Sequence, residues 1–129
     1  MWFHVDPSGG VPIYLQIVSQ VKRATASGLL KEGDQMPSVR ELATELIVNP
    51  NTIAKAYQEL ERDGIIKTVR GVGTFVAVKE VKFVLEERVK VINLAIDKVL
   101  IEAHHMGFSD EDVRNIFDDR INDWKVKNK

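Results

Sequence analysis

The clearest indication of the fold is the segment MPSVRELATELIVNPNTIAKAYQELERDGIIKTVRGVGTFV, which spans residues 36–76. In its middle, apolar residues recur at the i, i+3, i+4 and i+7 positions of one helix face, at Ile53, Ala56, Tyr57 and Leu60. Asn49 is a favourable N-cap, Pro50 suits the first helical turn, and Gly64 suits the end of a helix. The spacing therefore predicts an amphipathic helix between Asn49 and Gly64 whose apolar face packs inward.

A shorter helix is predicted immediately before it. Ser38 and Glu41 have the spacing of a capping box, and Pro37 precedes them, as is common where a helix begins. Apolar residues then mark one face of this segment, at Val39, Leu42, Ala43 and Leu46. The two predicted helices follow each other closely in the chain, so a tight turn must join them.

A β-hairpin is predicted after the second helix. Residues 65–68 and 74–78 are rich in β-branched and aromatic side chains, which favour strands. The loop between them contains Gly71 and Gly73 and places Arg70 at its tip; the glycines permit a tight turn and a close approach of the backbone to a ligand. Two helices joined by a turn and followed by a hairpin are the order of a winged helix-turn-helix, a unit that reads DNA.

The side of the second helix that faces away from its apolar stripe is polar and carries one cation. It is formed by Asn49, Asn51, Thr52, Lys55 and Gln58. A recognition helix contacts base edges and phosphates with its N-terminal residues, and the positive end of the helix dipole attracts phosphate. Arg40 lies off the apolar stripe of the first helix and close to its start, where it can reach a phosphate or a guanine edge.

Each of these residues also has an ordinary structural explanation. Arg40 and Arg70 could be solvated arginines, and Lys55 could be a phosphate ligand or a solvated lysine. The short polar residues at the start of the second helix could serve only as caps, although at Asn49 capping and DNA contact are compatible. Tyr57 fits the core with its hydroxyl at the edge, and stacking on a base is the alternative.

Composition sets further bounds. The chain has 129 residues, which supports one compact domain or a small domain with an appendage. It has no cysteine, which favours a cytoplasmic setting. Its net charge of −1 at pH 7 does not by itself indicate nucleic-acid binding. No apolar run is long enough to cross a bilayer, and no signal peptide is expected. Acids are absent from residues 35–40, 49–58 and 64–79, so a modest basic face with weak non-specific affinity for DNA is expected.

A further helix is predicted before residues 36–76. Pro12 begins it and Gly28 ends it, and the two leucines at 29–30 are then expected to enter the core. The aromatic residues at 2–3 are expected to pack either on this domain or on a second subunit. Residues 1–78 are thus predicted to form one small domain.

Residues 79–129 are predicted to form a helical tail. Residues 81–105 are predicted to form a long helix with more apolar positions than one face needs, and Ser109 with Asp112 has the spacing of a capping box for a second helix. The second helix has an apolar stripe at Val113, Ile116, Phe117, Ile121 and Trp124. Because a lone helical hairpin cannot bury this surface, the tail is predicted to form a homodimer. A two-fold dimer would place two recognition helices about 34 Å apart, or a multiple of that.

No catalytic or metal chemistry is predicted. The chain shows no nucleophile–base pair, phosphate loop or paired carboxylates, so neither an enzyme nor a cofactor is expected. Gly71 and Gly73 are not followed by a helix, which argues against a dinucleotide site. The adjacent histidines at 104–105 point about 100° apart on a helix, which favours a helix-end role over metal binding. The acid clusters at 110–112 and 118–119 lack EF-hand spacing.

The chain carries, in order, the segments VPIY (11–14), GDQMPSVRELA (33–43), NPNTI (49–53), AYQELE (56–61), GII (64–66) and GVGTFV (71–76). Together they resemble the GntR family of bacterial transcription regulators, most closely its small YtrA-like subfamily. The resemblance implies a winged helix-turn-helix that binds operator DNA, usually to repress, and a short dimerisation tail. It also implies family DNA contacts at Arg40, Asn49, Asn51, Thr52, Arg70 and Gly71. Family members often carry Ser-Arg-x-Thr at the start of the recognition helix, and here that arginine is replaced by Pro50.

The sequence therefore predicts a mainly α protein with a small β-hairpin, made of a winged helix-turn-helix domain (1–78) and a helical dimerisation tail (79–129). Its predicted function is a homodimeric bacterial transcription regulator, a repressor, that binds an inverted-repeat operator, with no cofactor, metal or membrane. The candidate DNA-binding residues are Ser38, Arg40, Asn49, Asn51, Thr52, Lys55, Arg70 and Gly71. Two alternatives stay open: a protein-interaction module with the same fold, and a regulator gated by a small-molecule effector at the tail interface.

Overall fold

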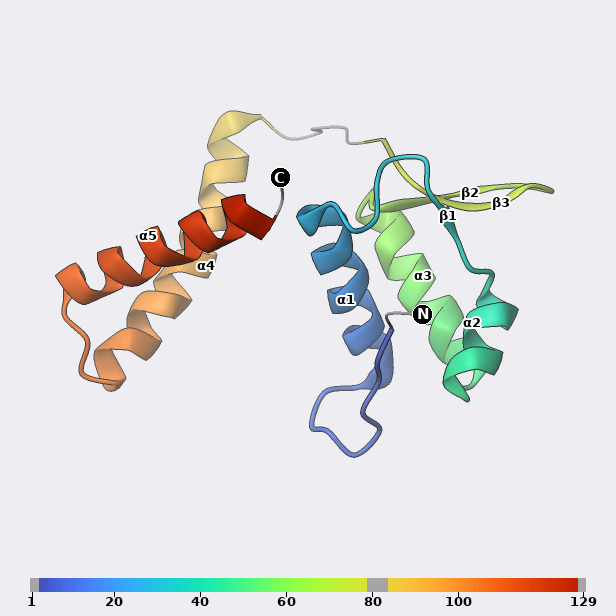
Figure 1. Ribbon diagram of the computed structural model, residues 1–129, viewed down its shortest axis with the longest axis horizontal. Helices are drawn as coiled ribbons and strands as arrows, with labels where there is room; N and C mark the ends of the chain where they lie inside the picture. Colours follow the sequence, from blue (N-terminus) through green and yellow to red (C-terminus); the bar gives the residue numbers. More distant parts are fainter. Residues whose placement is uncertain (1–2, 79–83, 128–129) are drawn as a thin grey trace. The chain divides into compact units, whose positions relative to one another are not determined.

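The computed structural model describes residues 3–78 and 84–127, with side chains as far as residue 124. The chain forms two compact units, residues 1–80 and 81–129. The first contains α1 (Ile13–Ser27), β1 (Gln35–Met36), α2 (Val39–Leu46), α3 (Pro50–Arg62), β2 (Ile66–Val69) and β3 (Gly73–Val76), and the second contains α4 (Leu85–His105) and α5 (Asp110–Lys127) (Figure 1). The predicted fold class, mainly helical with a winged helix-turn-helix, is confirmed. The predicted packing of Trp2 and the predicted helix start at residues 81–83 lie outside the described residues.

Helix α1 has the predicted bounds, but one of the two leucines after it was wrongly predicted. Gly28 ends the helix with a φ of 81°, a conformation that glycine adopts without a steric penalty. The Leu30 N–H then donates to the Ala24 carbonyl at 3.0 Å, which turns the chain back over the helix end. Leu30 packs against the core as predicted, whereas Leu29 points away from it and is 60% exposed.

The N-terminal arm packs on α1. Phe3 is buried in the core, which confirms that the arm packs on its own domain. The Asp6 N–H donates to Gln16 Oε1 at 2.8 Å, and Gln16 Nε2 donates back to the Asp6 carbonyl at 2.9 Å. Gln20 exchanges a similar pair of hydrogen bonds with the backbone of His4. Two glutamine side chains of α1 thus satisfy the arm's backbone as a neighbouring strand would.

Helices α2 and α3 begin at the predicted caps. The Glu41 N–H donates to Ser38 Oγ at 3.0 Å, and the Ser38 N–H donates to Glu41 Oε1 at 3.3 Å, which is the predicted capping box. Asn49 caps α3, and Pro50 is its first residue. Both helices bury their predicted apolar faces, α3 packs against α1 as well as α2, and the largest fully buried side chains are Ile17, Val21, Leu42, Ile53, Leu60 and Ile66.

The hairpin belongs to a three-stranded antiparallel sheet with the order β1-β3-β2. Strands β2 and β3 pair from Ile66 with Val76 to Val69 with Gly73, within two residues of the predicted strand bounds. The third strand, Gln35–Met36, was not predicted, because two residues are too few to show a strand period. It pairs with β3 and thereby ties the start of α2 to the base of the hairpin.

The second unit is a pair of helices. The Ser109 N–H donates to Asp112 Oδ2 at 2.9 Å and the Asp112 N–H donates to Ser109 Oγ at 3.1 Å, so the predicted capping box at the start of α5 is confirmed. Helix α4 buries none of its residues, and Val113 is the single buried side chain among those described on α5. No helix in the described part of the chain combines the length and the apolar composition needed to cross a lipid bilayer.

Candidate nucleic-acid interface

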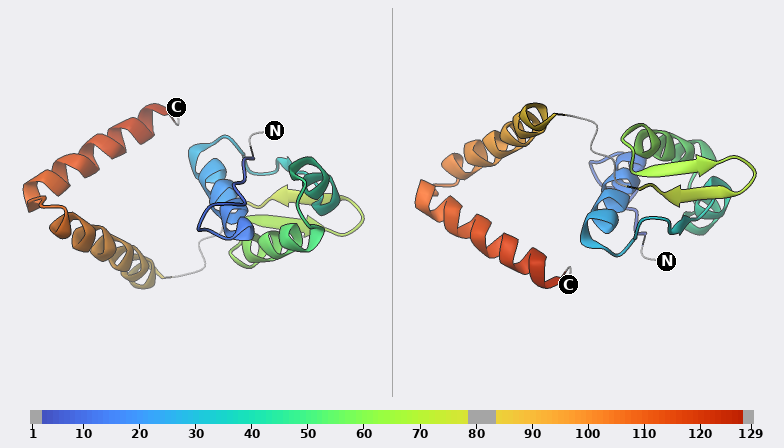
Figure 2. Two further views of the ribbon diagram at one scale, coloured as in Figure 1. Left: turned by 90° about the horizontal axis from the view of Figure 1, so that it is seen from below. Right: turned by 90° about the horizontal axis from the view of Figure 1, so that it is seen from above.

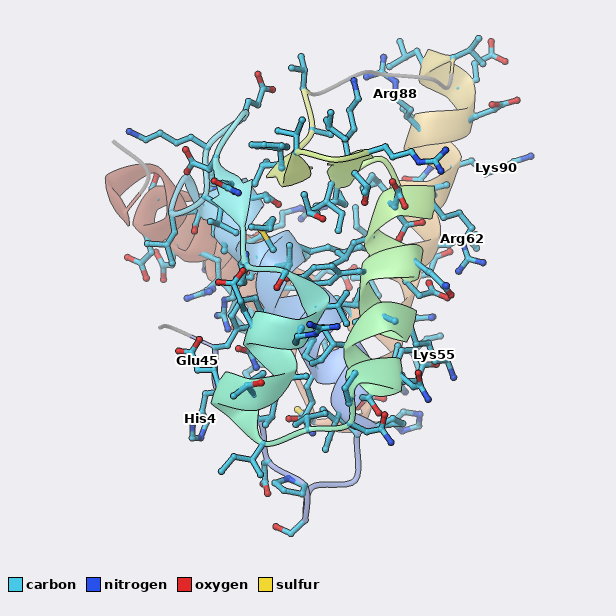
Figure 3. All side chains as sticks on the ribbon, turned by 90° about the vertical axis from the view of Figure 1, so that its right-hand side faces the viewer. His4, Glu45, Lys55, Arg62, Arg88 and Lys90 are labelled. Carbon is cyan, nitrogen blue, oxygen red and sulfur yellow. The ribbon has the colours of Figure 1, made fainter. Side chains whose placement is uncertain are left out.

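Helices α2 and α3 and the β2–β3 hairpin form one side of the first unit. Helix α2 packs directly on α3. In the three views of Figures 1 and 2 the tip of the hairpin projects beyond both helices, towards the side on which α2 lies. Figure 3 looks onto this side, with α2 and α3 next to each other below the hairpin. All eight candidate DNA-binding residues belong to these three elements or to the caps that begin them.

The start of α2 holds Ser38 and Arg40. The Ser38 oxygen accepts a hydrogen bond inside the capping box, and its hydroxyl proton remains able to donate to an outside acceptor. Arg40 is exposed two residues further on. The phenol of Tyr57, on α3, donates to the Pro37 carbonyl at 2.7 Å. This bond fixes the position of the α2 start relative to α3.

The phenol of Tyr57 stays protonated over the physiological range. Its burial raises the pKa of Tyr57 well above the ordinary value, and the nearby Glu41 carboxylate acts in the same direction. The hydroxyl can therefore act as a permanent hydrogen-bond donor to the Pro37 carbonyl. Tyr57 is buried, which fits the predicted core position with the hydroxyl at the edge and leaves no exposed ring face for a base.

The start of α3 holds Asn49, Asn51 and Thr52. The Asn51 N–H donates to Asn49 Oδ1 at 2.8 Å, so Asn49 is a helix cap, and its side-chain amide group retains two donors. Asn51 is exposed and Thr52 is half-buried. Capping therefore uses one acceptor of Asn49 and leaves the polar side chains of this turn available to a ligand.

Lys55 lies on the next turn of α3, and its position was not predicted from the sequence. Its ammonium nitrogen lies 4.0 Å from the centroid of the Tyr14 ring, which belongs to α1. Arg62, the other basic residue of α3, forms an ion pair with Glu59. Figure 3 shows Lys55 and Arg62 along the same edge of α3. Tyr14 is thus a residue of the candidate interface that sequence reasoning missed, because no spacing relates a residue of α1 to one of α3.

The hairpin presents Arg70 and Gly71 at its tip, and both are exposed. Gly71 has a φ of 78°, which closes the turn together with a 3.0 Å hydrogen bond from the Val72 N–H to the Val69 carbonyl. With no side chain on Gly71, its backbone can approach a ligand closely. The tip therefore offers one cation and an accessible backbone next to it.

Two helices joined by a tight turn, an exposed polar face on the second helix, and a projecting β-hairpin define a winged-helix DNA-binding transcription regulator. Residues 13–76 match the family described as "Bacterial regulatory proteins, gntR family". The chain belongs to the GntR family, as its resemblance to the YtrA-like subfamily implied.

The chain is 46% identical to the HTH-type transcriptional repressor YtrA of Bacillus subtilis (strain 168) over 103 residues, which cover 80% of this chain and 79% of YtrA. It is similar to the crystal structure of a protein named as a transcriptional antiterminator from Listeria monocytogenes EGD-e, with a TM-score of 0.80, 34% identity, and coverage of 96% and 92% of the two chains. It also resembles the DNA-binding domain of AraR in complex with operator ORX1, with a TM-score of 0.51, 28% identity, and coverage of 58% and 93%. The protein is therefore a transcription regulator and not an enzyme.

Proposed function

We propose that the protein is a homodimeric repressor that binds an inverted-repeat operator in the bacterial cytoplasm. In this proposal residues 1–78 are the DNA-binding domain and residues 79–129 are the dimerisation tail. The proposal rests mainly on one observation: the starts of α2 and α3 and the hairpin tip lie on one side of the unit and expose polar and basic groups. The AraR domain, which has a similar fold, was solved with its operator bound.

The candidate residues divide into three roles. We assign the base edges of the major groove to Asn49, Asn51 and Thr52. Amide side chains pair well with adenine, and a hydroxyl group can hydrogen-bond to the edges of several different bases. Ser38, Arg40 and Lys55 are assigned to phosphates, with Arg40 also able to reach a guanine edge. Arg70 and the Gly71 backbone are assigned to the contact made by the hairpin. The assignments follow from exposure and position on the three elements.

The proposed dimer rests on the second unit. Its two helices leave large apolar side chains exposed, among them Val89, Ile92, Val99, Leu100, Ile116 and Ile121. Between α4 and α5 lies an open, apolar groove of roughly 580 Å³, which Val99, Met106 and Phe117 help to line. Its lining also includes Lys98, Glu102 and Arg120, so both signs of charge are present. An apolar surface that carries both signs of charge can pair with a copy of itself about a two-fold axis, as an interface between identical chains requires.

The experiment that tests DNA binding is enrichment of genomic DNA fragments by the purified protein at physiological salt. The expected result is a set of fragments that share an inverted repeat with half-sites one or more helical turns apart. Arg40→Ala should weaken binding to such a fragment by about 1–3 kcal/mol if the side chain reads a base. The matched control is Arg23→Ala on α1, an exposed arginine outside the three elements, which should leave the dissociation constant unchanged. Recovery of fragments without a common sequence would contradict the proposal.

The experiment that tests dimerisation is sedimentation equilibrium of the full chain at micromolar concentration. The expected mass is twice the 14.6 kDa of one chain. A single-chain mass over the whole concentration range would contradict the proposed dimer. It would not bear on the assignment of the DNA-binding face.

Salt dependence separates this proposal from a role as a protein-interaction module. Contacts to phosphates release counterions, so affinity for DNA should fall steeply as salt is added. An interaction with a protein partner alone would leave the chain without measurable affinity for DNA at low salt. The small-molecule effector stays a prediction. The groove between α4 and α5 falls within the range of about 300–1,000 Å³ that small-molecule sites use.

A further inference from the structure

We infer that Tyr14 is a positioning residue for DNA binding: its ring holds the Lys55 ammonium group where it contacts a DNA phosphate. The inference rests on the proposed function, since it needs α3 to lie against DNA. It adds a residue of α1 to an interface otherwise formed by α2, α3 and the hairpin.

The geometry places the pair at one end of two aligned helices. Tyr14 is in the first turn of α1 and Lys55 in the second turn of α3, and the ammonium nitrogen lies 4.0 Å from the ring centroid. Near the other ends of the same helices, Lys22 Nζ and Asp63 Oδ2 are 2.9 Å apart. The two helices therefore run in the same direction, and the start of α1 lies beside the start of α3.

Lys55 also lies on the face of α3 that carries the base-reading candidates. Asn51 precedes it by four residues, so the two side chains lie one above the other on the helix. A phosphate ligand one turn behind a base-reading residue is the arrangement expected where a helix enters the major groove and passes the backbone.

The charges around Lys55 leave its ammonium group un-neutralised. Glu59 has the four-residue spacing at which it would normally pair with Lys55, but its carboxylate is paired with Arg62 instead. Among the described residues no carboxylate forms an ion pair with Lys55. A ring face attracts a cation without cancelling its charge, and it leaves the outward N–H donors of the ammonium group free.

The ring also reduces the entropic penalty of the contact. A lysine side chain has a long flexible stem, and fixing it on a phosphate costs rotamer freedom. Tyr14 is half-buried and packs against the core, so its ring is a fixed platform. At an exposed site a cation–π pair biases the lysine towards this position by about two- to five-fold, which sets the loss of affinity expected when the ring is removed.

The test uses a labelled DNA duplex of fixed sequence, because a phosphate contact does not depend on the bases. Dissociation constants of the full chain are measured over a salt series. Lys55→Met should weaken binding and reduce the salt slope by about 0.9, as expected for one lost phosphate contact. Tyr14→Leu should weaken binding about two- to five-fold, and Tyr14→Phe, which keeps the ring, should bind like the wild type.

The double variant separates a positioning role from a structural one. If Tyr14 acts through Lys55, then Tyr14→Leu should have no further effect in a Lys55→Met background. An equal additional loss in that background would show that Tyr14 only supports the fold, and the inference would be overturned. If Lys55→Met leaves affinity and salt slope unchanged while the wild type binds, the inference fails and the proposed function stands. If the wild type itself does not bind DNA at low salt, the proposed function fails.

A second measurement covers the case in which Tyr14→Leu does not fold, which circular dichroism would reveal. In the wild type and in Tyr14→Phe, the ring current should shift the NMR signals of the Lys55 ε-methylene protons upfield. The absence of that shift in the wild-type protein would overturn the inference without any use of the leucine variant.

Discussion

The two units of this chain differ in how far they bury their apolar side chains. In the first unit, three helices and a small sheet enclose a core in which residues such as Ile17, Ile53 and Leu60 are fully buried. In the second, α4 is longer than any helix of the first unit, yet it buries none of its residues. A side chain of this size gains about 1.5–3 kcal/mol from full burial, so the first unit carries its own stability and the second leaves most of that gain unrealised.

The difference separates a folding core from an assembly surface. An amphipathic helix must pack its apolar face against another element. Within the first unit, α1 and α2 both pack against α3 of the same chain. Most of the large apolar side chains described on α4 and α5 remain exposed in a single chain, which is why a second copy is the proposed partner. Equal substitutions in the two units should therefore have different consequences.

The largest expected effect is on the core of the first unit. Leu60→Ala should lower the free energy of unfolding by about 2–5 kcal/mol, because it removes a fully buried side chain and leaves a cavity. Chemical denaturation followed by circular dichroism measures it. The matched control is Leu100→Ala on α4, where the leucine is 42% exposed. This substitution should lower the free energy of unfolding of the first unit by less than about 0.5 kcal/mol. Equal losses from the two substitutions would show that the two units do not differ in how they use their apolar residues.

The next effect is on assembly. Val99 lines the groove between α4 and α5 and is 44% exposed in a single chain. Val99→Asp should weaken the proposed dimer by about 1–3 kcal/mol, because a charge would be buried without a partner. Sedimentation equilibrium measures the dimer dissociation constant. The control is Ala26→Asp at an exposed position of α1, and it should leave the dimer dissociation constant unchanged. An unaffected dimer in the Val99 variant would mean that another surface joins the chains.

A smaller effect concerns the bond between the two DNA-facing helices. Tyr57→Phe should lower the free energy of unfolding by about 0.5–1.5 kcal/mol, because the hydrogen bond to the Pro37 carbonyl is lost. Because the pKa of Tyr57 is raised in the folded state, its contribution is complete below the unfolded-state pKa of about 10 and is lost as the pH rises towards the folded-state pKa. The wild type should therefore lose stability above about pH 10 more steeply than Tyr57→Phe. Parallel pH profiles from thermal melts would contradict this assignment.

The smallest effect has the opposite sign. Ile47, in the turn between α2 and α3, has a φ of 55° and is 93% exposed, so a β-branched residue occupies a left-handed conformation without gaining burial. Ile47→Gly should raise the free energy of unfolding by about 0.5–1 kcal/mol, since glycine adopts this conformation without strain. Thermal melts measure it, and Val48→Gly at the half-buried neighbour should instead destabilise. A loss of stability in the Ile47 variant would mean that its side chain makes a contact that offsets the strain.

Local chemistry explains what could be predicted. The capping boxes at Ser38 and Ser109 and the cap at Asn49 act within one helical turn, so a short spacing reveals them. The buried faces of α1 to α3 follow from the helical period. Strand β1 could not be predicted, because Gln35 and Met36 are extended only through their pairing with β3. The DNA contacts of the eight candidate residues stay predictions.

The class of this protein could be recognised from its amino-acid sequence. Helical periodicity, caps and the ordered family segments are properties of the chain read from one end to the other, so they can be recognised without coordinates. Two contacts could be seen only in the folded chain: the Lys55 ammonium group lies over Tyr14, and the Tyr57 hydroxyl donates to the Pro37 carbonyl. These contacts join residues that are distant in the chain, and the packing of α3 against α1 and α2 brings them together.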